Sequence, residues 1–166
     1  MNTSNNRTLA RFVMAIAFIA AAFGTSNAQA DDGHLVFSTA AYHFKNFNER
    51  NAFTPGIGWE YSPTGKLGFH VGTLSDSFGA QAGYAGINYG TRRFINNRVR
   101  FLLGASVVYK QYHKNADLEA KIVPFPVMEI ALSKWAKFNI TGSPELDYAG
   151  SHSNAVMFFQ FKMNLM

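Results

Sequence analysis

The chain has no cysteine among its 166 residues. Disulfide bonds, thiol nucleophiles and thiolate metal sites are therefore excluded. Outside residues 12–23, no apolar stretch approaches the ~20 residues that a membrane-spanning helix requires. The histidines and acidic residues show no spacing typical of a metal site, so we expect neither a metal nor another cofactor. The net charge is +5, and removal of Arg7 and Arg11 would leave about +3, a mild excess that says little about partners. We expect no nucleic-acid partner.

The first 30 residues predict a secretory signal peptide. Arg7 and Arg11 give a positive start, residues 12–23 are uniformly apolar, and a small-x-small pattern ends at Ala30. This run is short for a spanning helix and is flanked as signal peptides are, although an uncleaved anchor is the alternative. We expect cleavage to leave a single domain, residues 31–166.

Alternation at period two is the main signal in the rest of the chain. In the stretch 99–109, one face is almost wholly apolar: Val99, Phe101, Leu103, Ala105, Val107 and Tyr109. Eight segments of this kind are expected to be strands: 35–44, 54–61, 67–75, 78–90, 98–110, 121–132, 137–141 and 154–165. Strands with one strongly apolar face suit a sheet in contact with lipid or with an apolar core.

The number and length of these segments predict an all-β fold, an eight-stranded antiparallel transmembrane β-barrel of the bacterial outer membrane. Aromatic residues near the expected strand ends suit interfacial girdles: Trp59, Tyr61, Tyr89, Tyr109, Tyr112 and Trp135. The alternative is a soluble secreted barrel or sandwich, in which the apolar faces would form the core. We expect a monomer that depends on the barrel-assembly machinery for insertion.

Asp76 and Ser77 lie between two of the expected strands. With both termini periplasmic, the connections after the first, third, fifth and seventh strands face outward, and this pair lies in the second of them. Asp and Ser favour turns because they bond their own backbone, so a polar two-residue turn is one interpretation. The other is a chemical role at the external rim of the barrel.

Five segments together resemble the lipid A palmitoyltransferase (PagP) family. They are FNER at 47–50, PGIGWEY at 55–61, SDSFGAQAGYAGINYG at 75–90, IVPFPVMEIALS at 122–133 and ITGSPE at 140–145. The resemblance implies an outer-membrane barrel that transfers an acyl chain from a phospholipid to lipid A. It also implies an Asp-Ser pair at Asp76 and Ser77, and a catalytic histidine that best matches His43 in Tyr42-His43.

Acyl transfer requires a base that assists a hydroxyl, and Ser77 with His43 would supply it. Asp76 would orient the imidazole or the acceptor sugar. His113 and His152, in the expected outer loops, are alternative bases. His43 is otherwise an interfacial residue.

Three prolines and one asparagine bear on substrate binding. Proline interrupts strand pairing, so Pro124, Pro126 and Pro144 predict either an opening in the barrel wall that admits lipid, as in the family, or an irregular strand and loop. Asn88 stands where the family has the glycine that floors its acyl pocket, which implies a shorter pocket.

The sequence leaves two functions open. One is the lipid A acyltransferase implied by the resemblance, and the other is a non-enzymatic barrel that displays outer loops. A soluble lipid-binding barrel is disfavoured by the outward Phe and Met residues.

Overall fold

The computed structural model describes residues 33–45, 48, 50–62, 66–112, 117–148 and 151–165. The expected signal peptide lies outside these residues. The described residues form ten strands: β1 (Gly33–His43), β2 (Phe53–Tyr61), β3 (Leu67–Ser75), β4 (Gln81–Gly90), β5 (Val99–Gln111), β6 (Leu118–Ala131), β7 (Ala136–Ser143), β8 (Leu146–Tyr148), β9 (Ser151–Ser153) and β10 (Val156–Asn164).

Eight of the strands close into an antiparallel barrel in which β1 pairs with both β2 and β10. The eight-stranded prediction is thus confirmed, with strand boundaries shifted by a few residues. Strand β4 begins at Gln81 instead of residue 78, because residues 76–80 form a turn. The outer connection 142–153 was expected to be loop, but it contains the hairpin β8–β9.

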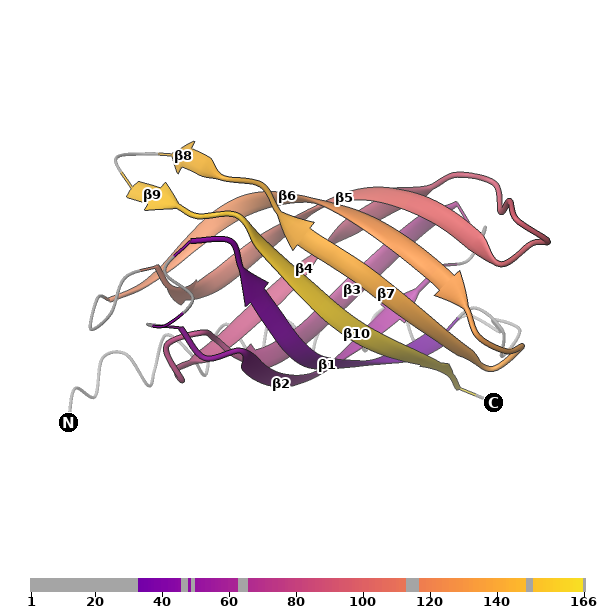
Figure 1. The fold of residues 1–166 in the computed structure, drawn as a ribbon, viewed down its shortest axis with the longest axis horizontal. Helices are drawn as coiled ribbons and strands as arrows, with labels where there is room; N and C mark the ends of the chain where they lie inside the picture. The colour runs from indigo at the N-terminus through magenta and orange to yellow at the C-terminus, as the bar shows by residue number, and fades with distance from the viewer. Residues whose placement is uncertain are drawn as a thin grey trace.

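The two ends of the barrel differ in what they carry (Figure 1). The hairpin β8–β9 extends beyond one end, which also bears the turn 76–80, and we call this the loop end. The C-terminus lies at the opposite end with the turns after β2, β4 and β6, and we call this the terminal end. By the expected topology, the loop end is external.

The barrel is apolar outside, and many of its most deeply buried side chains are polar or charged. Large exposed side chains on the strands include Ile57, Ile87, Phe101, Leu103, Ile122 and Phe161. By contrast, the largest fully buried side chains are Lys162, Glu129, Thr54 and Asp76. A soluble barrel has the reverse arrangement. Apolar side chains on the outer face suit contact with lipid, where the backbone N–H and C=O groups of each strand must form their hydrogen bonds within the sheet. No helix in the described ranges is long and apolar enough to cross a membrane.

A β-bulge in β1 decides which way the loop end of that strand faces. The register with β10 shifts between Ser38 and Ala40, and the extra residue, Thr39, donates its hydroxyl hydrogen to the Phe159 carbonyl at 3.1 Å. A bulge reverses the alternation beyond it. Buried positions therefore run through Val36 and Ser38, and then through Ala41 and His43.

The ladder between β6 and β7 is short. Strand β6 pairs with β5 over its length, from Leu118 to Ile130, but with β7 only from Val127 to Ala131. The loop-end half of β6 therefore has a ladder on one side only. This is the stretch that contains Pro124 and Pro126.

Candidate functional site

The turn between β3 and β4 is organised by Asp76. Its Oδ1 accepts hydrogen bonds from the backbone N–H groups of Phe78 and Ala80, both at 2.9 Å. The backbone of Asp76 also bonds Ala80 and Gly79, and Gly79 adopts a positive φ of 82° that favours glycine. Asp76 is 2% exposed. These hydrogen bonds give Asp76 the predicted role in a turn, but the turn has five residues instead of two.

Ser77 and His43 form a hydrogen-bonded pair at the loop end. Ser77 Oγ lies 2.6 Å from His43 Nε2, and both residues are buried. The β1 bulge brings His43 to this side of the wall, and the Asn51 N–H donates to the Ser77 carbonyl at 2.9 Å. A hydroxyl in contact with an imidazole is the arrangement that permits proton removal from the hydroxyl. The three residues predicted to be catalytic are thus neighbours, although Asp76 bonds the turn and not the imidazole.

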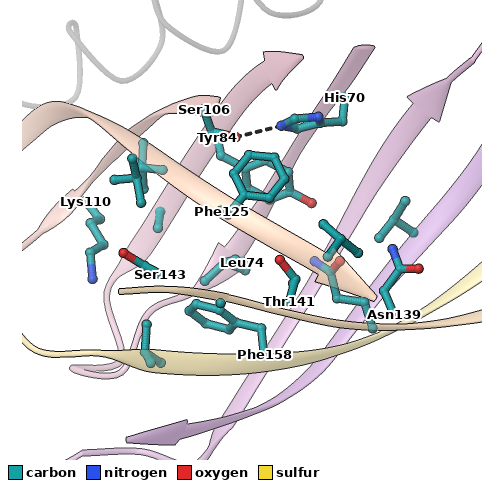
Figure 2. Close-up of a pocket in the computed structure, with 18 of the residues that line it drawn as sticks. His70, Leu74, Tyr84, Ser106, Lys110, Phe125, Asn139, Thr141, Ser143 and Phe158 are labelled. Atoms are coloured by element: carbon teal, nitrogen blue, oxygen red, sulfur yellow. Dashed lines mark hydrogen bonds between the residues drawn. The ribbon is translucent and has the colours of Figure 1, made fainter. Parts of the chain in front are cut away.

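A cavity of about 150 Å³ lies inside the barrel and reaches Ser77 of this pair. Figure 2 shows part of its lining. Asp76 and Ser77 are among its lining residues, whereas His43 is behind Ser77 and outside the lining. Much of the wall is apolar: Val36, Leu74, Leu102, Val108, Val123, Phe125, Val127, Val156 and Phe158. An apolar pocket with a few polar groups at one place is the usual form of a small-molecule site.

Asn88 lies on the cavity wall in a polar group with His70 and Ser106. Its Nδ2 is 3.5 Å from His70 Nδ1, and His70 Nε2 bonds Ser106 Oγ at 2.6 Å, as Figure 2 shows for His70 and Ser106. The His70 ring also packs edge-on against Phe125. Asn88 is 4% exposed and occupies lumen volume that a glycine would leave empty. The expectation that Asn88 limits the pocket stays a prediction.

Lys110 is a lining residue that the sequence interpretation did not single out. It is half-buried at the loop end of β5, far from Asn139 in Figure 2. The strand parity that places Ser106 and Val108 inward also places Lys110 inward. Extending the alternation of this strand by one residue would have found it.

Tyr112 was expected in an aromatic girdle, but it is buried and lines the cavity. Its hydroxyl donates to the Val108 carbonyl at 3.2 Å. The ammonium groups of Lys110 and Lys121 lie 5.0 and 4.2 Å from its ring centroid. Burial raises the pKa of the Tyr112 phenol to about 12, so this residue remains a neutral platform for cations.

The three prolines lie apart from the cavity lining. Pro124 and Pro126 are exposed on the outer face of β6, while their neighbours Val123, Phe125 and Val127 line the lumen. Thr141 Oγ1 donates to the Pro126 carbonyl at 3.0 Å, next to the last β6–β7 pair. Pro144 is exposed just after β7. These positions agree with an interrupted ladder, and a direct contact with substrate stays a prediction.

At the terminal end, the lumen is filled by a network of buried charges. Glu129 accepts hydrogen bonds from Arg93 at 2.5 Å, Arg100 at 2.8 Å and Lys162 at 2.7 Å. Lys162 also donates to Glu60 at 2.6 Å, and Lys137 contacts His34 nearby. Buried charges are tolerated when they are paired and hydrogen-bonded in this way.

The structure does not describe the side chains of the two alternative bases. His113 lies outside the described residues, and the side chain of His152 is not described. Among the residues that the structure describes, no group of three or more histidine and acidic side chains is arranged to hold a metal ion.

Known proteins resemble this chain in structure. A designed transmembrane β-barrel aligns with a TM-score of 0.57 and 13% identity, covering 80% of this chain and 94% of that one. The chain has a transmembrane-barrel fold. A second designed barrel, TMB2.3, aligns with a TM-score of 0.51 and 10% identity, covering 81% of this chain and 95% of that one.

A natural example is the N-terminal β-barrel domain of OprF from Pseudomonas aeruginosa. It aligns with a TM-score of 0.50 and 10% identity, covering 80% of this chain and 97% of that domain. No protein-family model and no curated protein sequence matches the chain. At these identities the likeness concerns the fold alone, which is of the outer-membrane type.

Proposed function

We propose that the protein is an outer-membrane enzyme that transfers an acyl chain from a phospholipid to lipid A at the loop end of its barrel. The observation that carries this is the buried 2.6 Å contact between Ser77 Oγ and His43 Nε2 beside a largely apolar cavity. The predicted signal peptide and the apolar outer surface support the location. The resemblance to the PagP family supplies the choice of reaction.

In this proposal, the donor's acyl chain lies in the cavity and its ester lies at Ser77. His43 Nε2 takes the proton from the Ser77 hydroxyl as Oγ attacks the ester carbonyl. The lysophospholipid alkoxide leaves with the proton from His43, and an acyl-serine remains. A hydroxyl of lipid A then loses its proton to His43 and attacks the acyl carbonyl. The bond between that carbonyl and Ser77 Oγ breaks, and His43 returns the proton to Oγ. Asp76 contributes by fixing the turn that carries Ser77.

Lipid is proposed to enter sideways, beside the loop-end half of β6. There the ladder to β7 is absent beyond Val127, and Pro124 and Pro126 have no N–H to offer a neighbouring strand. At the other end, the charge network centred on Glu129 closes the lumen. In this proposal, lipid reaches the chain-holding volume from the leaflet in which lipid A would lie.

The test is mass spectrometry of lipid A from Gram-negative cells with and without the wild-type gene. We expect one added acyl chain with the wild type and none with Ser77→Ala. Ser75→Ala is the matched control, because Ser75 ends β3 two residues earlier and does not line the cavity. Folding of each variant is checked by a shift in gel mobility between boiled and unboiled samples. Unmodified lipid A in cells with folded wild-type protein would refute the proposal.

The second candidate is a non-enzymatic barrel. It is favoured by Asp76, whose Oδ1 is used by two backbone N–H groups of its own turn. That role requires no substrate, and Asx turns of this kind are common. If Ser77→Ala and wild-type cells have the same lipid A, this candidate replaces the first.

A further inference from the structure

One carboxylate oxygen of Asp76 has no hydrogen-bond donor in the described part of the chain. Oδ1 is filled by Phe78 and Ala80, but Oδ2 is buried and unpartnered. Leaving a buried charged acceptor without a donor is costly. Asp76 also lines the cavity, so a ligand in the cavity would be in position to supply the donor.

Lys110 lines the same cavity with the opposite charge. Within the described residues its contact is the Tyr112 ring, which it shares with Lys121. Asp76 attracts the Lys110 charge, whereas Arg50 and Lys121 repel it. An ammonium offers three donors, and an anion bound here would relieve the repulsion among the three cations.

Asp76 and Lys110 remain separate, because no salt bridge joins them among the described residues. An ion pair between them would satisfy both charges internally. Two separated, opposite charges at one cavity instead match a ligand that carries a cation and an anion a short distance apart. The apolar wall formed by Leu74, Val108 and Phe158 continues from this point, so the ligand also has a hydrocarbon part.

We propose that the loop end of the lumen binds the phosphoethanolamine headgroup of a phospholipid, with Asp76 accepting hydrogen bonds from its ammonium and Lys110 donating to its phosphate. This deepens the proposed function, on which it rests, by naming the donor class. The ester of such a lipid lies between its headgroup and its acyl chain. Ser77 has the matching position, because it follows Asp76 in the chain and lines the same cavity as the apolar wall. The phosphorylated sugars of lipid A carry no ammonium, so Asp76 suits the donor and not the acceptor.

The experiment measures lipid retention, which does not require turnover. Purified protein in detergent receives equal amounts of phosphatidylethanolamine and phosphatidylglycerol with identical chains, and bound lipid is counted by native mass spectrometry. We expect the wild type to prefer phosphatidylethanolamine by roughly tenfold, the value of one charge-assisted hydrogen bond. Ser75→Ala, outside the cavity lining, should show the same preference. Equal retention of the two lipids by the wild type would overturn the proposal.

Variants and a modified lipid assign the two charges. Asp76→Asn keeps the Oδ1 acceptor of the turn and should abolish the preference, while Asp117→Asn, an exposed acid outside the cavity lining, should not. Lys110→Met should lower retention of both lipids by a similar factor, and Lys110→Arg should restore it. An unaltered preference in folded Asp76→Asn would overturn the role of the carboxylate.

Two further measurements keep the proposal testable if Asp76→Asn does not fold. N-acetylated phosphatidylethanolamine retains the phosphate but has no ammonium, and wild-type protein should hold it no better than phosphatidylglycerol. Free O-phosphoethanolamine should be held far more weakly than the lipid, and equal retention would overturn a lipid ligand. Selective retention without any acyl transfer would leave the headgroup site intact and refute only the proposed reaction.

Discussion

At the terminal end of the lumen, Glu129 is 0% exposed and accepts hydrogen bonds from three cationic side chains. At the loop end, Asp76 is 2% exposed, and one of its carboxylate oxygens has no hydrogen-bond donor among the described residues. The first region fills its space with matched charges. The second retains a cavity of about 150 Å³ beside a serine–histidine pair. A buried charge that is fully paired stabilises one arrangement of the strands, while the buried Asp76 oxygen without a described donor is the basis of the ligand site that we propose.

The largest effect is expected from removing His43. Because Ser77 and His43 act as one unit in the proposed reaction, His43→Ala should lower lipid A acylation by on the order of 10³-fold or more. The double variant with Ser77→Ala should be little worse than either single variant. Rates are measured with purified protein in mixed micelles, and boiled and unboiled gel mobility reports the fold. Additive losses in the double variant would show that the two residues do not cooperate.

A large loss of stability is expected at the terminal end from Glu129→Gln. The substitution leaves Arg93, Arg100 and Lys162 around a neutral amide, and breaking a buried charge network of this kind typically costs about 3–5 kcal/mol. Urea unfolding in detergent, followed by tryptophan fluorescence, measures the change in the free energy of unfolding.

The control for this variant is Glu119→Gln, which removes an acid that is 54% exposed beside Lys121. That change should cost less than about 1 kcal/mol. If the two variants were equally stable, the network would not be what holds the terminal end together.

A smaller effect, on selectivity instead of rate, is expected from Asn88→Gly. Removing the amide should deepen the cavity, because Asn88 is 4% exposed and lines it. Each additional buried methylene contributes about 0.8 kcal/mol, which is roughly a fourfold gain in binding. Mass spectrometry of lipid retained from a mixture of chain lengths should therefore shift toward longer chains. An unchanged distribution would exclude Asn88 as a limit on the pocket.

The barrel was predictable from sequence because its signal is local. Alternation in segments such as 99–109 depends only on which face meets lipid, and all eight barrel strands were found. The network around Glu129 was half predictable, since Arg100 and Lys162 fall on inward positions of their strands. Their pairing across β5, β6 and β10 depends on the shear of the closed sheet, which no single strand encodes.

The site was less predictable, and the β1 bulge shows why. Strict alternation from His34 and Val36 would turn His43 outward, and only the register shift after Ser38 turns it inward. His43 was proposed from a family resemblance and not from strand parity. The role of Asp76 in its own turn followed from turn chemistry, but turn chemistry does not predict that its second oxygen is buried without a donor among the described residues.

The smallest effect is expected where charges at the loop end face solvent. Lys45 and Glu145 form a salt bridge of 2.8 Å between the segment after β1 and the segment after β7, and their side chains are 58% and 42% exposed. Water screens such a pair, and ordering two flexible side chains offsets much of the attraction, so the coupling should be about 0.2–1 kcal/mol. A double-mutant cycle with Lys45→Ala and Glu145→Ala, read by urea unfolding, isolates this value. A coupling free energy as large as the loss in free energy of unfolding in Glu129→Gln would contradict this. It would mean that exposed and buried charge pairs contribute equally to the stability of this barrel, and that its two ends do not differ in this respect.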